Sequence, residues 1–351
     1  MVDVNYINAA LRRRQAGYGR GKRMSIEEDK VEILSGLRKR RTIGSPVSFI
    51  IRNKDYSLER LPKVTAPRPG HADLAGALKF ASHDARDILE RSSARETAAR
   101  VAAGVLAGLF LKDFGVRVIS HTVALGGIEA ATRGLSLDEI EEKTAASRLS
   151  CADPKAEEKM IGAIDEASEK GDTLGGLFEV IVVNVPPGLG SHVQWDKRLD
   201  ARLAGALMSI QAVKGVEIGI GFEGAGRRGS EVHDEIFYES SRAGLKFYRK
   251  TNNAGGIEGG ISNGENIVLR AALKPIPTLG QPLSSVDLVS KKEVKAAKER
   301  ADVTVVPAAG VIGEAVVALE VASAFLEKFG GDSLDEVKLN FRGYMDQIER
   351  F

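Results

Sequence analysis

Arginine and lysine residues set beside glycine and proline are the groups in this sequence best suited to chemistry, because they can bind anions. Residues 12–23 read Arg-Arg-Arg-Gln-Ala-Gly-Tyr-Gly-Arg-Gly-Lys-Arg. Such a run is typical of a solvated face or a nucleic-acid patch, but its interleaved glycines favour a folded loop that points guanidinium groups inward. A second cluster places Arg68, His71 and Asp73 in a turn stiffened by two prolines and a glycine.

Two further segments place groups that suit a phosphate at the ends of predicted elements. Ser92, Ser93 and Arg95 stand at the predicted start of a helix, where free backbone N–H groups and the helix dipole attract anions. Lys274-Pro-Ile-Pro-Thr278 ends a predicted strand with a cation and a hydroxyl on a stiff turn. The glycine-rich residues 252–264 are suited to folding over a flat ligand. Together these segments predict a ligand with several anionic groups.

The elements that must position these clusters are helices and strands in mixed order. A capping box at Ser93–Glu96 predicts a helix over residues 93–115. Apolar spacing and glycine stops predict further helices over 197–214 and 313–328, a last helix capped by Ser333, and a peripheral helical excursion over 141–170. Strands are expected at 48–51, 116–123, 178–185 and 267–273. Without a regular βαβ repeat, and with no Gly-x-Gly-x-x-Gly expected after a strand, the order predicts an α+β fold, not a dinucleotide-binding doubly wound sheet, in one domain of residues 1–351.

Composition and charge exclude several classes of protein. A net charge of +2 over 351 residues gives no overall field that demands a nucleic acid or an anionic membrane. The single cysteine, Cys151, cannot form an internal disulfide, and no signal-peptide pattern is visible, so a reduced, cytoplasmic protein is expected. The apolar stretch 303–326 is interrupted by Pro307, Glu314 and Glu320, which argues against a membrane span. No metal-binding spacing is present, and we expect no metal.

The clusters, taken in order, resemble the chorismate synthase family from about Leu11 to about Leu326. The segments that carry the resemblance are Arg12-Arg-Arg-Gln with Gly17-Tyr-Gly-Arg-Gly21, Arg68-Pro-Gly-His-Ala-Asp73, Glu90-Arg-Ser-Ser-Ala-Arg-Glu-Thr97, Gly188-Leu-Gly190, Met208-Ser-Ile210 with Lys214-Gly215, residues 252–264, Lys274 to Thr278, and Arg300-Ala-Asp302 before Pro307-Ala-Ala-Gly310. The resemblance implies a single-domain β-α-β sandwich, a homotetramer, and conversion of 5-enolpyruvylshikimate 3-phosphate to chorismate. That reaction is a 1,4-anti elimination of phosphate and a C6 hydrogen, and it requires reduced FMN without net redox change.

The resemblance also implies roles for individual residues. His71 would donate to negative charge on the reduced flavin, and Asp302 would assist the proton removed from C6. The substrate's anionic groups, or the phosphate of NADPH as a candidate reductant, would be held by Arg14, Arg20, Arg23, Arg68 and Arg95. The FMN-binding positions would be Arg91, Ser92, Ser93, Gln211, Ala212, Gly259, Lys274, Pro275, Ile276, Pro277, Thr278 and Arg300.

Each assignment has a simpler structural alternative. His71 could be a loop histidine with satisfied hydrogen bonds, Asp302 could pair with Arg300, and Ser92 and Ser93 could be helix caps. A cap and a phosphate ligand are compatible roles at one helix N-terminus, so this alternative does not exclude the other.

The sequence also departs from the family pattern. The family opens with Gly-Glu-Ser-His-Gly, whose histidine is thought to protonate the departing phosphate, and that segment is absent before Leu11. Arg-Ser-Asp of the family is Arg-Ala-Asp here, at residues 300–302. We therefore expect slow turnover and an exposed sheet edge or unfilled groove. A non-catalytic homologue that binds flavin or substrate, and a nucleic-acid-binding protein, are the alternative functions.

Overall fold

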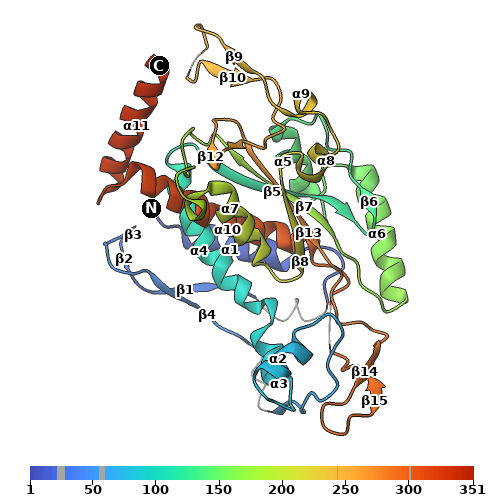
Figure 1. Ribbon diagram of the computed structural model, residues 1–351. Coiled ribbons are helices and arrows are strands. Elements are labelled where there is room, and N and C mark those ends of the chain that lie inside the picture. The colour runs from blue at the N-terminus through green and yellow to red at the C-terminus, as the bar shows by residue number, and fades with distance from the viewer. Residues whose placement is uncertain (22–27, 55–59, 243, 300–301) are drawn as a thin grey trace.

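The computed structural model describes residues 1–21, 28–54, 60–242, 244–299 and 302–351 (Figure 1). Its helices are α1 (Val4–Gln15), α2 (Asp73–Lys79), α3 (Arg86–Arg91), α4 (Thr97–Lys112), α5 (Leu137–Ala146), α6 (Pro154–Glu169), α7 (Leu199–Met208), α8 (Gly221–Ala225), α9 (Gly229–Val232), α10 (Val306–Phe329) and α11 (Leu334–Arg350), with 3-10 turns η3 (Ala94–Glu96) and η4 (Trp195–Lys197). Its strands are β1 (Val31–Ser35), β2 (Leu37–Arg38), β3 (Arg41–Thr42), β4 (Ser48–Ile51), β5 (Arg117–Leu125), β6 (Ile128–Glu129), β7 (Gly176–Val183), β8 (Val213–Ile218), β9 (Ile236–Tyr238), β10 (Phe247–Arg249), β11 (Ile257–Glu258), β12 (Ile261–Ser262), β13 (Ile267–Leu273), β14 (Ser284–Val286) and β15 (Glu293–Lys295).

A five-stranded sheet in the order β6-β5-β7-β13-β8 forms one layer of the fold, and all of its neighbouring pairs are antiparallel. In β13 the side chains of Ile267, Leu269, Ala271 and Leu273 are buried, because alternate residues of a strand face the same side of the sheet. The alternation in the sequence predicted this strand with its correct bounds. The predicted α+β class is confirmed.

A layer of helices packs on the sheet, with α10 at its centre. α10 contacts α1, α4 and α7 as well as strands β5 and β7, and most of its residues are buried. Gly104 of α4 makes the close α4–α10 crossing possible, since a Cβ at this position would lie 2.4 Å from the Cα atom of Ala315. Strands β1 and β4 pair with each other and contact α1 and α4, to the left of the helices in Figure 1, whereas the sheet lies to their right.

A small lobe at the bottom of Figure 1 holds α2, α3 and the β14–β15 hairpin. Val64, Ala77, Ala85 and Leu288 form its own apolar core. Backbone hydrogen bonds from Leu288 to Thr65 and from Ala297 to Ala66 join its two chain segments. This pairing brings residues near 68 beside residues near 278, although they lie far apart in the sequence.

Several predicted bounds are wrong for identifiable reasons. Ser93 caps only the turn η3, since its hydroxyl accepts from the N–H of Arg95. The Glu96 carboxylate accepts from the Gln211 amide and does not complete a capping box, so α4 begins at Thr97. Lys214 and Gly215 do not stop α7 but belong to β8. α10 begins at Val306 instead of Gly313 because Pro307 fits the first turn of a helix. The last helix is capped by Ser333, as predicted.

The excursion over 141–170 is helical but not peripheral. It contains most of α5 and all of α6, and Met160 and Ile164 of α6 are fully buried in the main core. The helical character was predicted correctly, whereas the many charges of the stretch concealed its buried face.

Residues 219–224 read Gly-Ile-Gly-Phe-Glu-Gly after β8, which matches the pattern of a dinucleotide-binding loop. The structural context of such a loop is missing, because β8 pairs antiparallel with β13 and α8 has only 5 residues. Gly219 is required for packing, since a Cβ there would lie 2.0 Å from the backbone oxygen of Asn253. The expectation that the chain lacks a dinucleotide-binding sheet is therefore supported, although the motif itself is present.

Among the described residues, α10 is the one helix whose length and apolar composition would allow it to cross a membrane. Of its most apolar window, 72% is buried inside the protein, as in the core helix of a globular fold.

Candidate active site

Arg68, His71, Asp73 and Thr278 form a buried hydrogen-bonded network between the two segments of the small lobe. Nε and Nη2 of Arg68 donate to the two carboxylate oxygens of Asp73 at 2.8 and 3.1 Å, and its Nη1 donates to Oγ1 of Thr278 at 2.6 Å. Nδ1 of His71 lies 2.5 Å from Oδ1 of Asp73. The structure thus joins two clusters that the sequence predicted separately.

Asp73 holds this network together as an ionised carboxylate. Its burial disfavours the charged form, but hydrogen bonds from His71 and Arg68 outweigh this and hold the pKa of Asp73 far below its ordinary value. A buried Arg68 guanidinium therefore has a full counter-charge beside it.

Lys274 links this network to the segment before β8. Its Nζ donates to the carbonyl oxygen of Gly70 at 2.6 Å, and its backbone N–H donates to the carbonyl oxygen of Ala212 at 3.0 Å. Desolvation, together with the charge of Lys214, lowers the pKa of Lys274. Beside Ala212, the Gln211 amide donates to Oε1 of Glu96 at 2.7 Å, while its Oε1 atom is buried without a partner among the described residues.

A second cluster gathers arginines around Asp29. Nη1 of Arg14 lies 3.1 Å from Oδ2 of Asp29, and Nη1 of Arg95 lies 2.7 Å from Oδ1. Arg14 comes from the end of α1, and Arg95 comes from η3, the turn that also carries Glu96. Hydrogen bonds and chain neighbours therefore connect Lys274, through Gln211 and Glu96, to this cluster.

Arg20 and Asp302 form a third pair, with Nη1 3.0 Å from Oδ2, and the N–H of Gly21 donates to the other oxygen of Asp302. Asp302 is therefore in an ion pair, as the structural alternative predicted, and its partner among the described residues is Arg20. Its predicted alternative partner, Arg300, lies outside the described residues, as does Arg23.

The guanidinium groups of Arg95 and Arg20 act electrostatically on that of Arg14. Burial, together with the charges of Arg95 and Arg20, lowers the pKa of Arg14 to about 10, although Asp29 opposes these effects. Burial also lowers the pKa of Arg20, against the effect of Asp302. Such a concentration of partly desolvated cations is suited to a polyanionic small molecule.

Other predicted residues are less closely gathered. The Ser92 hydroxyl donates to the carbonyl of Ile88 and that of Ser93 caps η3, so both have the structural roles named as alternatives. Arg91 is exposed at the end of α3. Residues 275–277 follow β13, and the carbonyl of Ile276 accepts from Thr173.

Gly259 is not brought to the cluster. It lies next to Gly260, which bonds Leu199 at the start of α7, whereas Gln211 and Ala212 follow the end of that helix.

Sequence reasoning missed Asp29 and Glu96 and gave Asp73 no role of its own. Nothing in the local sequence separates Asp29 from its acidic neighbours Glu27 and Glu28. The only signal was indirect, because a buried cluster of arginines requires counter-charges.

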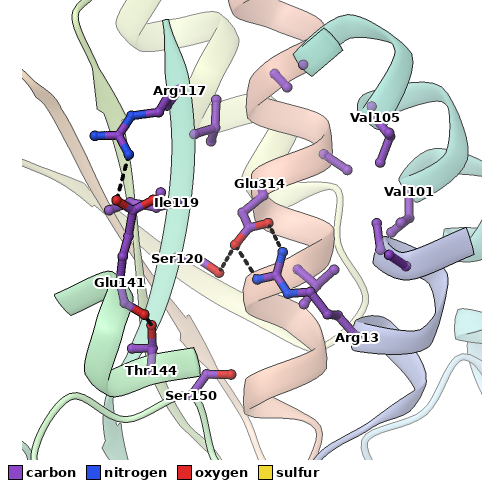
Figure 2. A pocket seen from close by; sticks show the side chains of 18 of the residues that line it. Arg13, Val101, Val105, Arg117, Ile119, Ser120, Glu141, Thr144, Ser150 and Glu314 are labelled. Carbon is purple, nitrogen blue, oxygen red and sulfur yellow. Dashed lines mark hydrogen bonds and ion pairs between the residues drawn. The ribbon is translucent and has the colours of Figure 1, made fainter. Parts of the chain in front are cut away.

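A cavity of about 950 Å³ lies elsewhere, between α1, α4, α10 and the β5 edge, and no predicted site residue lines it. Figure 2 shows Arg13 and Ser120 directed toward Glu314 inside it. Nη1 of Arg13 donates to Oε2 of Glu314, and the Ser120 hydroxyl donates to Oε1, each at 2.8 Å. β6 pairs only with the end of β5, and in the described part of the chain residues 117–121 have no strand partner on that side.

The fold is of the α+β class, and its arginine-rich cluster is suited to binding a small polyanion. The profile of the chorismate synthase family matches residues 1–326. The chorismate synthases of Geobacter metallireducens and Geobacter sulfurreducens are 58% and 56% identical to this sequence over 100% of the chain and 93% of each relative. A crystal structure of chorismate synthase, 43% identical, superposes with a TM-score of 0.81 over 100% of this chain and 91% of that one. The chain belongs to the chorismate synthase family.

Membership confirms the resemblance, the fold class and the reaction. The protein is a lyase of aromatic biosynthesis that eliminates phosphate from the small molecule 5-enolpyruvylshikimate 3-phosphate to give chorismate. None of the comparisons supports the non-catalytic alternative or a nucleic-acid ligand.

Proposed function

We propose that the cluster from Arg68 to Asp302 is the site of phosphate elimination and that it requires reduced FMN. The observation that carries this proposal is the line of contacts from His71 and Lys274 through Gln211 and Glu96 to Arg95 and Arg14. It places cations from four distant segments in one continuous region, as a substrate with two carboxylates and a phosphate needs.

Arg14, Arg20, Arg68 and Arg95 are proposed to hold the substrate's anionic groups, with Arg23 as a further candidate. Arg95 is the best placed of these to meet a ligand, because its side chain is 23% exposed while that of Arg14 is 7% exposed. Asp302 is proposed to help the C6 proton leave the site, since a carboxylate oxygen can accept a proton.

The residues near Lys274 fit a flavin. The buried, unpaired Oε1 atom of Gln211 is an acceptor suited to a ring N–H, and the adjacent Ala212 is hydrogen-bonded to the backbone of Lys274, whose side chain supplies a cation. Arg91, Ser92, Ser93, residues 275–277 and Arg300 complete the proposed set, whereas Gly259 lies by the other end of α7 and is left out of it. When bound, reduced FMN supplies an electron-rich ring beside the substrate. His71 is proposed to donate a hydrogen bond to negative charge on that ring.

The remaining features are proposed on the same basis. The chain acts as a single domain in a cytoplasmic homotetramer, with NADPH as a candidate source of reducing equivalents. Sedimentation of the purified protein would test the tetramer directly.

Chorismate formation under anaerobic conditions, with chemically reduced FMN, tests the proposed site. We expect Gln211→Leu and Lys274→Met each to weaken flavin binding about tenfold, because each variant removes one buried or charged hydrogen bond. Arg117→Ala, which changes the cavity of Figure 2, is the matched control and should leave flavin affinity unchanged. Equal effects of all three variants would contradict the proposed location.

A further inference from the structure

We propose that Asp29 is a positioning residue, whose buried carboxylate holds the Arg14 and Arg95 guanidinium groups in the arrangement that receives an anionic group of the substrate. The proposal rests on the substrate-binding role proposed above for these two arginines. No motif in the sequence pointed to Asp29.

The Asp29 carboxylate lies between the two arginines and contacts each with a different oxygen. Oδ2 is 3.1 Å from Nη1 of Arg14, and Oδ1 is 2.7 Å from Nη1 of Arg95. The N–H of Asp29 donates to Oε1 of Gln15 at 3.0 Å, which ties its backbone to the end of α1. One residue therefore connects the loop before β1 with both α1 and η3.

The other contacts of the arginines orient them around this carboxylate. Nε of Arg14 donates to Oγ1 of Thr97 at 2.9 Å, and its Nη2 donates to the carbonyl of Ala94 at 3.2 Å. Nε of Arg95 donates to Oδ1 of Asn53 at 2.7 Å. Each guanidinium is thus held at two or more points, and Asp29 is the partner that they share.

A shared counter-charge is needed here because the two cations repel each other in a partly desolvated region. Burial and the charge of Arg95 lower the pKa of Arg14, and Asp29 opposes both effects. Without the carboxylate, the guanidinium groups would gain by moving apart, and the geometry for a bidentate contact would be lost.

Asp29 lies behind the arginines and does not occupy the ligand's place. Its side chain is 0% exposed, whereas that of Arg95 is 23% exposed. Its role is therefore to orient the cations and not to compete with the substrate for them. Removing its charge should weaken substrate binding, whereas removal of a competing anion would strengthen it.

The test compares Asp29→Asn, Arg95→Ala and the double variant in the full chain with reduced FMN, by KM and kcat for 5-enolpyruvylshikimate 3-phosphate and by thermal unfolding. Glu320→Gln is the matched control, because Glu320 pairs with Arg202 outside the cluster. We expect Asp29→Asn to raise KM about tenfold with kcat nearly unchanged, and to add little in the Arg95→Ala background. Oxidised FMN should bind all the variants as it binds the wild type.

An unchanged or lowered KM in Asp29→Asn, or full additivity with Arg95→Ala, would overturn the proposal. If Asp29→Asn does not fold, Asp29→Glu keeps the charge but moves the oxygens by one methylene, and it should raise KM in the same way. A normal KM in Asp29→Glu would overturn the proposal. If Arg95→Ala itself leaves KM unchanged, the proposed arginine site fails and this inference fails with it.

Discussion

Nδ1 of His71 lies 2.5 Å from Oδ1 of Asp73, whose side chain is fully buried. An ionised carboxylate can only accept, so the ring nitrogen facing it carries the hydrogen. Nε2 is then the nitrogen that remains for a proton or a ligand, although Nη2 of Arg68 lies 3.3 Å from it and 3.0 Å from Nδ1. Asp73 thereby sets both the direction and the tautomer of the histidine.

Replacing His71 tests its proposed role beside the flavin. His71→Ala should lower kcat by roughly 10²–10⁴, the contribution of a positioned proton donor. Oxidised FMN should bind nearly as before, because the proposed contact matters for charge on the reduced ring. Single-turnover rates and flavin dissociation constants measure the two effects separately. Normal chemistry in the variant would reduce His71 to a loop residue.

The protein should become less stable at acid pH as Asp73 becomes protonated. Its pKa in the folded protein is depressed, so its contribution is present above the ordinary pKa of about 4 and is lost as the pH falls toward the folded value. Asp73→Asn should cost about 3–5 kcal/mol of unfolding free energy at pH 7, since it leaves the buried charge of Arg68 unpaired. Urea unfolding between pH 7 and pH 3 should show this difference shrinking below pH 4. A difference independent of pH would contradict the prediction.

Two glycines on α4 should respond oppositely to the same substitution. Gly104→Ala places a methyl group 2.4 Å from Ala315 and should destabilise the protein by roughly 1–3 kcal/mol. Gly108→Ala, one turn later, meets nothing within 4 Å and should be neutral or stabilising by up to about 1 kcal/mol. Thermal unfolding of both variants measures this. Similar losses in the two would mean that α4 and α10 are not packed as described.

The enzyme should require FMN that has been reduced by another agent. The residues after β8 have the glycine pattern of a dinucleotide loop but neither the parallel strand nor the long helix that would bind NADPH in that way. Chorismate formation should therefore occur with dithionite-reduced FMN under anaerobic conditions. Steady turnover in air with NADPH and oxidised FMN, without a reductase, would contradict this.

Helices and strands were predictable where one local pattern had no competing tertiary contact. The alternation in β13 and the Ser333 cap of α11 are examples, since strand period and capping act within a few residues. The start at Ser93 and the stop at Lys214 were wrong because tertiary contacts took over the groups that would have made the cap or ended the helix. Glu96 bonds Gln211, and residues 213–218 pair with β13.

The sequence by itself determined the family, the reaction and the positively charged character of the site. The reason is that arginines and histidine in a fixed order indicate an anionic ligand, and the glycines between them indicate local turns. Only the tertiary structure decided which charges meet. Arg20 pairs with Asp302, Arg68 with Asp73 and Thr278, and Asp29 lies between Arg14 and Arg95. The physical reason is that a counter-charge is selected by distance and burial, which depend on how helices and strands far apart in the chain pack together, and no local pattern records them.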